Sequence, residues 1–129
     1  VLSNVEIYNQ SYEDTLIHLE QLNINELPAF FYFDPPYKPL SESSSFTSYS
    51  KDSFSDEDQA QLKSFCDLLD EKGYQWLLSN SDTTNVDSEN TFFDDMYSEY
   101  KIERVKASRS INSKGSKRGQ INELLIRNY

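Results

Sequence analysis

The 129-residue sequence contains one cysteine, one histidine and three glycines, and it has no long apolar run. A single cysteine, Cys66, allows no internal disulfide, which favours an intracellular origin. Because His18 is also alone, the sequence supports no metal site and no histidine-dependent catalytic triad. No stretch approaches the roughly 20 apolar residues that span a bilayer, and no basic-then-apolar leader precedes the first expected strand. We therefore expect no membrane association.

Charge is unevenly distributed along the chain, although its formal net value is −10. Residues 1–100 carry −16, whereas residues 101–129 carry +6. A basic segment on an acidic body can face the phosphates of a nucleic acid, and a solvated basic surface explains the same distribution equally well. The aromatic share of 14 % argues against a disordered chain, and the length allows one small domain with a modest core.

Hydrophobic periodicity predicts strands and helices that alternate along the chain. Strands are expected over residues 5–8, 29–33, 74–78, 100–107 and 123–128. Helices are expected over residues 12–22, from a capping box at 55–58 to Gly73, and over residues 88–97. Polar loops are expected at residues 38–54 and 108–120. This alternation indicates an α/β fold with a mainly parallel sheet.

Three local features refine this prediction. Ser11 can cap the first helix, and Cys66 falls at helical spacing with apolar neighbours, which predicts a small core residue. The unbroken apolar run at residues 29–33, which is aromatic from Phe30 onward, is typical of a strand buried on both faces of a parallel sheet.

The tetrapeptide Asp34-Pro35-Pro36-Tyr37 ends that aromatic run abruptly. With average residue usage, its chance occurrence in a chain of this length is on the order of one in a thousand. A tight turn explains the two prolines, but it explains neither the aspartate before them nor the tyrosine after them. A second polar cluster, Ser79–Asp82, follows the next expected strand. An ordinary turn at the end of a strand explains this cluster almost as well as a functional role does. Because ligands bind beyond the carboxyl ends of parallel strands, we expect both clusters to lie in one crevice.

With these residues the sequence resembles the amino-methylating DNA methyltransferases, and specifically the Dam-type adenine methyltransferases. The matching segments, in the order of that family, are residues 9–16, 31–37, 39–41, 46–49, 53–54, 78–82, 109–113, 118 and 123–125. The resemblance implies a Rossmann-like S-adenosylmethionine-dependent sheet, mainly parallel, with an antiparallel C-terminal strand. It also implies that residues 1–129 form the C-terminal half of the domain, which holds the target base.

The resemblance implies roles for the motif that fit its chemistry. The Asp34 carboxylate and the Pro35 backbone oxygen would each accept one hydrogen of an adenine amine, and the rigid Pro36 would hold Tyr37 to stack on the flipped base. The implied cofactor is S-adenosylmethionine, contacted by Ser11, Tyr12, Phe33 and Asp34. The implied partner is double-stranded DNA, contacted by Lys38, Arg109, Lys114, Lys117 and Arg118. A helix cap explains Ser11 equally well, and solubility explains the basic residues.

Several parts of that family are missing from the sequence. It contains neither the Phe-x-Gly-x-Gly cofactor loop, nor the acidic residue that binds the cofactor ribose, nor the inserted module that reads DNA. We therefore expect an N-terminal half elsewhere, and an isolated chain that is inactive or self-associates. A non-catalytic remnant that binds nucleic acid or a partner is the alternative.

Methylation of a cytosine amine, an RNA adenine or a protein amide is a further alternative, which Asp rather than Asn at position 34 disfavours. The resemblance suggests GATC as the target and a cytoplasmic, nucleoid-associated protein of bacterial or phage type. It leaves a restriction system and a role in repair or gene regulation open.

Overall fold

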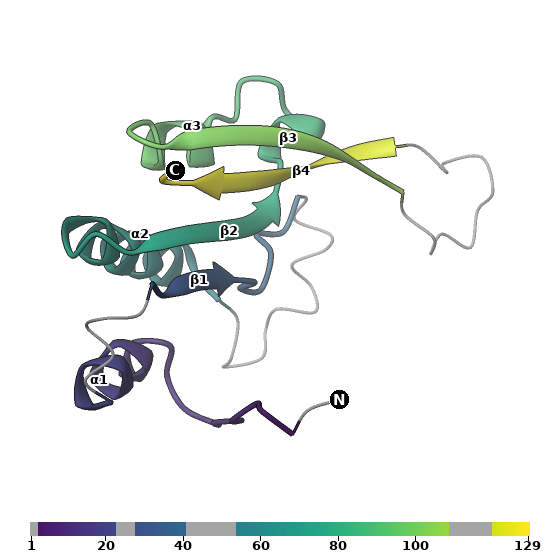
Figure 1. Ribbon diagram of the computed structural model, residues 1–129. Coiled ribbons are helices and arrows are strands. Elements are labelled where there is room, and N and C mark those ends of the chain that lie inside the picture. Colours follow the sequence, from purple (N-terminus) through teal and green to yellow (C-terminus); the bar gives the residue numbers. More distant parts are fainter. Residues whose placement is uncertain (1–2, 23–27, 41–53, 109–119) are drawn as a thin grey trace.

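Four strands form one mixed sheet within residues 3–22, 28–40, 54–108 and 120–129, the part of the chain that the computed structural model describes (Figure 1). The strands are β1 (Phe30–Phe33), β2 (Gln75–Ser81), β3 (Lys101–Ser108) and β4 (Gln120–Arg127), and they lie in the order β1-β2-β4-β3. The α/β class predicted from the sequence is confirmed.

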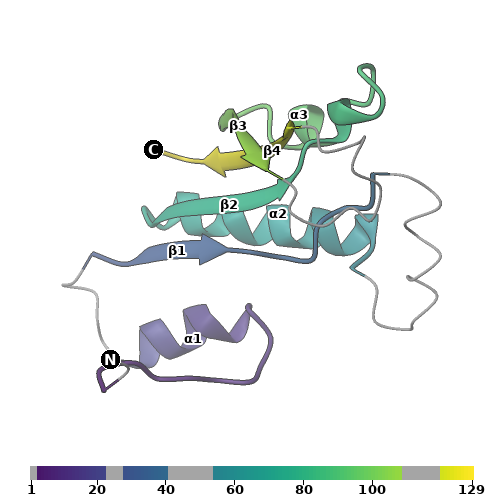
Figure 2. The ribbon, with the colours of Figure 1, turned by 90° about the vertical axis from the view of Figure 1, so that its right-hand side faces the viewer.

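The strand directions explain how the sheet is built. β1 pairs in parallel with β2, from Phe30 opposite Gln75 to Phe33 opposite Leu78. β4 pairs antiparallel with both β2 and β3. Consequently β1, β2 and β3 run in one direction and only β4 runs against them among the described strands, as Figure 2 shows for β1, β2 and β4. One of the three described pairings is therefore parallel, although three of the four strands point the same way.

Helix α2 (Asp56–Glu71) begins and ends where the sequence predicts. The Ser55 side chain accepts a hydrogen bond from the Asp58 backbone N–H at 3.2 Å, and the Asp58 carboxylate accepts one from the Ser55 N–H at 2.7 Å. This reciprocal capping box satisfies two backbone donors that the first turn leaves free. The helix ends before Gly73, whose φ of 80° lies in the left-handed region that glycine adopts without strain.

Helix α1 (Asp14–Gln21) begins two residues later than predicted, and Ser11 is not its N-cap. Residues Tyr12 and Glu13 form a turn, in which the Ser11 carbonyl accepts the Asp14 N–H at 3.2 Å. The Ser11 hydroxyl accepts only a long bond of 3.4 Å from the Glu13 N–H. Because the turn places Ser11 before the first helical residue by three positions, its side chain cannot cap the helix.

The predicted strand at residues 5–8 is wrong: these residues belong to no strand and form no ladder. Val5 is 53 % exposed and Ile7 is 82 % exposed. A strand requires a partner for its backbone N–H and C=O groups, and no described segment pairs with this one. Two other elements differ in length from the prediction. The helix expected over residues 88–97 is the shorter α3 (Phe92–Met96), which follows the 3-10 helix η2 (Thr83–Asn85). The strand expected over residues 74–78 is the longer β2, which extends to Ser81.

The expectation that residues 29–33 are buried on both faces is also wrong. β1 lies at one side of the described sheet, where Phe31 is 7 % exposed but Phe30 and Tyr32 are 53 % and 58 % exposed. The cause is that the described helices cover one face of the sheet only, the face on which Phe31 contacts the core.

The core lies between that covered face and the helices. Its buried members from the sheet are Phe31, Trp76, Leu78, Leu124 and Ile126, and those from the helices include Leu16, Leu62, Phe65, Leu69 and Phe93. The Trp76 ring meets the Tyr100 ring edge-on with 4.7 Å between centroids, in the range favoured by aromatic pairs. Cys66 is fully buried among these residues, as predicted, and burial raises the pKa of its thiol.

Replacing Ser55 by alanine removes one half of the capping box. We expect Ser55→Ala to lower the free energy of unfolding by about 1 kcal/mol, measured by urea denaturation of the complete protein. Because the Ser55 N–H hydrogen bond lowers the pKa of Asp58, the other half persists at neutral pH and is lost as the pH falls through that lowered value. The matched control is Ser64→Ala in the same helix, where an exposed hydroxyl only donates to the Ala60 carbonyl. Equal losses in both variants would contradict a specific capping effect.

Candidate active site at the ends of two parallel strands

The Asp34-Pro35-Pro36-Tyr37 motif leaves the sheet directly after β1, next to the end of β2. Proline has no backbone N–H and therefore stops the ladder at this point. β2 continues beyond the last paired residue of β1, because Ser79, Asn80 and Ser81 pair with β4 instead. These residues belong to the strand and not to a turn after it, which corrects the sequence prediction. Their proximity to the motif, predicted from the topology, is confirmed.

One oxygen of the Asp34 carboxylate is held by Ser79. The Ser79 hydroxyl lies 3.0 Å from Asp34 Oδ1 and donates to it, and the Tyr32 hydroxyl donates to Ser79 at 3.3 Å. Ser79 is 4 % exposed, so this short chain of hydroxyls fixes the carboxylate from the sheet side. Among the described residues, the other oxygen, Oδ2, receives no hydrogen bond from a side chain. Asp34 is exposed, and Oδ2 can therefore accept a hydrogen bond from a substrate.

A pocket of about 270 Å³ opens beside Asp34. Its lining consists of Tyr12, Tyr32, Phe33, Asp34, Pro35, Pro36, Phe54 and Leu62. Five of these eight residues, Tyr12, Phe33, Asp34, Pro35 and Pro36, were predicted as site residues from the sequence. Aromatic and proline faces with one carboxylate at the rim form a pocket suited to a flat heterocycle that carries hydrogen-bond donors.

Two predicted site residues lie beside this pocket without lining it. Ser11 is exposed and precedes Tyr12. Tyr37 is 38 % exposed, and burial of the rest of its ring raises the pKa of its phenol, so the ring is neutral at physiological pH.

Lys38, predicted to contact DNA, is engaged by the protein itself. Its ammonium group pairs with the Asp56 carboxylate and lies 4.3 Å from the centroid of the Phe92 ring. Its side chain is 19 % exposed. The other predicted DNA contacts, Arg109, Lys114, Lys117 and Arg118, lie outside the described residues.

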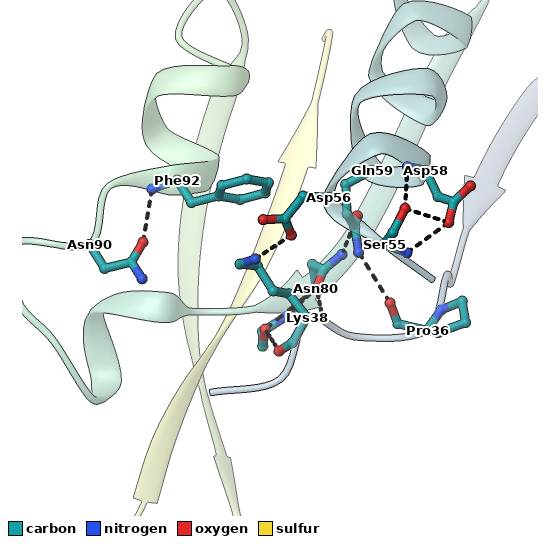
Figure 3. A network of polar contacts seen from close by, with 10 residues as sticks. Pro36, Lys38, Ser55, Asp56, Asp58, Gln59, Asn80, Asn90 and Phe92 are labelled. Atoms are coloured by element: carbon teal, nitrogen blue, oxygen red, sulfur yellow. Dashed lines mark hydrogen bonds and ion pairs between the residues drawn. The ribbon is translucent and has the colours of Figure 1, made fainter. Parts of the chain in front are cut away.

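Two buried amide side chains connect the motif to α2 and β2 (Figure 3). The side-chain oxygen of Asn80, Oδ1, accepts a hydrogen bond from the Lys38 backbone N–H at 3.0 Å. The side-chain NH₂ group of Asn80 donates to the side-chain oxygen of Gln59, Oε1, at 3.2 Å. The Gln59 NH₂ group in turn donates to the Pro36 carbonyl at 3.3 Å. The Ser81 hydroxyl donates to the Lys38 carbonyl at 2.7 Å.

Gln59 was not singled out from the sequence, although a signal for it exists. It lies at helical spacing with Leu62 and Cys66 and is 1 % exposed, so it is a polar residue on the apolar face of α2. A buried polar group is costly unless it is hydrogen-bonded, and such an exception in an amphipathic pattern therefore indicates a specific partner.

The neighbouring buried carboxylate, Asp82, differs from Asp34 because its hydrogen-bonding capacity is used. Asp82 is fully buried, and its Oδ2 accepts from Arg104 Nε at 2.9 Å. Its Oδ1 accepts from the Thr84 hydroxyl at 2.7 Å and from the Thr84 N–H at 3.1 Å. Arg104 Nη2 also donates to both carboxylate oxygens of Asp94, and this hydrogen bonding raises the pKa of the guanidinium. Asp82 is therefore a structural carboxylate, and Asp34 is the one that can meet a substrate.

Within the described ranges, no cluster of three or more histidine, cysteine or acidic side chains has the geometry of a metal site. The described helices include none with the length and apolar character needed to cross a membrane.

Comparison with known proteins points to enzymes that act on adenine, a flat heterocycle of the kind that suits the pocket beside Asp34. The model of the D12 class N6 adenine-specific DNA methyltransferase family matches residues 1–111. The chain is 52 % identical over 102 residues to the type II methyltransferase M.MjaIII of Methanocaldococcus jannaschii, covering 78 % of this chain and 33 % of that protein. It is 34 % identical over 122 residues to the DNA adenine methylase of Escherichia coli K12, covering 95 % of this chain and 39 % of that protein. The chain thus spans between one third and two fifths of these relatives.

Proposed function

Because the chain belongs to the D12 class N6 adenine-specific DNA methyltransferase family, we propose that the complete protein methylates the exocyclic amine of adenine in double-stranded DNA. The observation that carries this proposal is the position of Asp34, whose carboxylate is held on one side by Ser79 and lines the pocket with its neighbours. The names of the two relatives, a type II methyltransferase and a DNA adenine methylase, agree with it.

The chemistry assigned to the motif follows from the electronic structure of the target amine. The nitrogen lone pair of adenine is delocalised into the ring, which makes the amine a poor nucleophile. Asp34 Oδ2 and the Pro35 carbonyl oxygen are the acceptors proposed for the two amine hydrogens. Accepting both hydrogens favours a pyramidal nitrogen with a localised lone pair, and fixed acceptors do this without reorganisation. No covalent intermediate with the protein is needed, which agrees with the buried position of Cys66.

Tyr37 is proposed as the surface on which the flipped adenine stacks. An enzyme that modifies a base must take it out of the duplex, at a cost of a few kcal/mol. A half-exposed, neutral aromatic ring directly after the two prolines can recover part of that cost. The prolines fix φ at two consecutive residues and so restrain the distance between the acceptors and the ring.

The pocket residues fit the methyl donor proposed for this family. S-adenosylmethionine, when bound, supplies an electrophilic methyl group. Tyr12 and Phe33 offer aromatic faces for a purine ring, and Asp34 offers a carboxylate at the rim. Ser11 is adjacent to Tyr12 and is proposed as a further polar contact at the pocket entrance.

DNA contacts are proposed for Lys38 and for the basic residues of the C-terminal segment, Arg109, Lys114, Lys117 and Arg118. Lys38 lies next to Tyr37, and a DNA phosphate would compete with Asp56 for its ammonium group. The target sequence proposed from the resemblance is GATC.

The remaining part of the catalytic domain is proposed to pack on β1. The chain covers 33–39 % of its relatives, and the side of β1 that carries Phe30 and Tyr32 is exposed. A Rossmann-like sheet would continue beyond the edge of β1 that pairs with no other strand in the described part of the chain, and the glycine-rich cofactor loop would come from that added part. Residues 1–129 are then the half of the domain that holds the target base.

Substituting Asp34 tests the proposed acceptor. We expect Asp34→Ala in the complete protein to reduce the single-turnover rate of methyl transfer on the order of 100-fold to 1,000-fold, with DNA affinity nearly unchanged. Asp34→Asn should fold like the wild type and still lose most of the rate, because the amide lacks the negative charge. The rate is measured by transfer of a tritiated methyl group to a duplex oligonucleotide.

The matched control is Glu71→Ala, an exposed acidic residue at the opposite end of α2. Full activity of Asp34→Ala would exclude Asp34 as the acceptor. A complete wild-type protein that binds DNA without turnover would instead support a non-catalytic remnant.

Substituting Tyr37 separates stacking from hydroxyl chemistry. We expect Tyr37→Phe to retain most activity and Tyr37→Ala to weaken base flipping by about 1–3 kcal/mol, the range for a base stacked on an aromatic ring. Flipping is read from the fluorescence of 2-aminopurine placed at the target adenine. A severe, equal loss in both variants would assign the role to the hydroxyl.

The isolated 129-residue chain tests whether another part of the protein completes the site. We expect it to bind S-adenosylmethionine weakly or not at all by calorimetry, and to self-associate in sedimentation experiments through the exposed side of β1. Phe30→Lys should reduce this association, because an edge lysine opposes pairing of strands. Adding the N-terminal fragment should restore cofactor binding and methylation together. A monomeric wild-type chain that binds the cofactor alone would refute this arrangement.

A further inference from the structure

The side chains of Gln59 and Asn80 close a ring of hydrogen bonds around the backbone of Tyr37. The Lys38 N–H donates to Asn80, Asn80 donates to Gln59, and Gln59 donates to the Pro36 carbonyl, over distances of 3.0, 3.2 and 3.3 Å. The Pro36 carbonyl belongs to the peptide group before Tyr37, and the Lys38 N–H belongs to the peptide group after it. Both peptide groups that flank Tyr37 are thus held by one pair of amides (Figure 3).

The prolines restrain only some of the dihedrals that place the Tyr37 ring. Their rings fix φ of Pro35 and Pro36, but ψ of Pro36 and both dihedrals of Tyr37 remain free to rotate. Rotation of ψ at Pro36 moves its carbonyl away from Gln59, and rotation of ψ at Tyr37 moves the Lys38 N–H away from Asn80. The amide pair therefore restrains the dihedrals that the prolines do not.

Burial makes the amide pair an effective restraint. Gln59 is 1 % exposed and Asn80 is fully buried, so a lost hydrogen bond there is not replaced by water. All three bonds run in the same donor-to-acceptor sense, and such chains polarise and strengthen each other. The Ser81 hydroxyl, which donates to the Lys38 carbonyl at 2.7 Å, fixes the next peptide group as well.

We propose that Gln59 and Asn80 are positioning residues that set the orientation of the Tyr37 ring and so the geometry of the site for the flipped base. This inference rests on the proposed function and adds to it two residues that act through the backbone and touch neither base nor cofactor. Stacking requires the ring at a fixed distance and tilt from the acceptors Asp34 and Pro35, and a displacement of about 1 Å can cost a hundredfold in rate.

The test is a double-mutant cycle in the complete protein between Gln59→Met and Tyr37→Ala. Methionine preserves the length and most of the volume of Gln59 but makes neither hydrogen bond. We expect Gln59→Met to lower the 2-aminopurine signal and the single-turnover methylation rate by between about tenfold and a hundredfold, with the dissociation constant for S-adenosylmethionine nearly unchanged. Because the buried Asn80 NH₂ group loses its acceptor, the melting temperature should fall by several degrees, and the rates are measured well below it. In the Tyr37→Ala background, the same substitution should cost little more, because it acts through the ring that is already gone.

The matched control is Gln61→Met on the exposed side of the same helix, where the side chain bonds only to Glu13. It should behave like the wild type. If Gln59→Met does not fold, Gln59→Glu enters the same cycle at alkaline pH, where its carboxylate is ionised. The carboxylate keeps an acceptor for Asn80 and the size of the side chain but loses the donor to Pro36.

Non-additive losses support the proposal, whereas additive losses or a fully active Gln59→Met enzyme overturn it. A wild-type protein without adenine methylation would instead contradict the proposed function, which keeps the two failures distinguishable.

Discussion

The parallel pairing of β1 with β2 is the constraint on which the arrangement of the site depends. Parallel strands end at the same edge of a sheet, so Asp34, the residue after β1, comes next to Ser79 in β2 although 45 residues separate them. The two strands differ in how they end. β1 is stopped by proline, whereas β2 continues along β4 and carries its side chains past the motif. The polar residues at the end of β2 therefore form the support on which the motif rests.

The same pairing brings the buried polar side chains at the end of β2 within reach of hydrogen-bond partners, which lowers the free-energy cost of burying them. Along β2 the composition changes from the apolar Trp76 and Leu78 to the polar Asn80, and all three are fully buried. Hydrogen bonds to the motif and to α2 satisfy Asn80, and ion pairing with Arg104 satisfies Asp82. Removing one partner from such a network leaves a buried polar group without compensation, which costs about 1–3 kcal/mol. Stability at this edge of the sheet and geometry of the motif are thus coupled through the same atoms.

Much of this was predictable from the sequence, and the failures have physical causes. The α2 boundaries follow from local chemistry, the capping box at Ser55 and the glycine at position 73, and both were predicted correctly. The proximity of Asp34 to the end of β2 was also predicted, because neighbouring parallel strands end at the same edge of a sheet. The strand at residues 5–8 and the double burial of residues 29–33 depend on neighbours that the described chain does not supply, so alternation and apolar runs could not decide them. Gln59 was missed because periodicity identifies the buried face of a helix but gives no partner for a polar residue on it.

Tyr32 belongs both to the uncovered face of β1 and to the lining of the pocket. Its ring is 58 % exposed on the uncovered face of the sheet, it lines the pocket, and its hydroxyl donates to Ser79, which holds Asp34. Anything that covers this face of β1 therefore contacts a residue only two hydrogen bonds away from the proposed acceptor. Burying Tyr32 would exclude water from the Tyr32–Ser79–Asp34 chain and strengthen each bond in it, because a hydrogen bond is electrostatically stronger in a low-dielectric environment. In the proposed function, a part of the protein that covers this face of β1 would therefore prepare the acceptor carboxylate without supplying the acceptor itself.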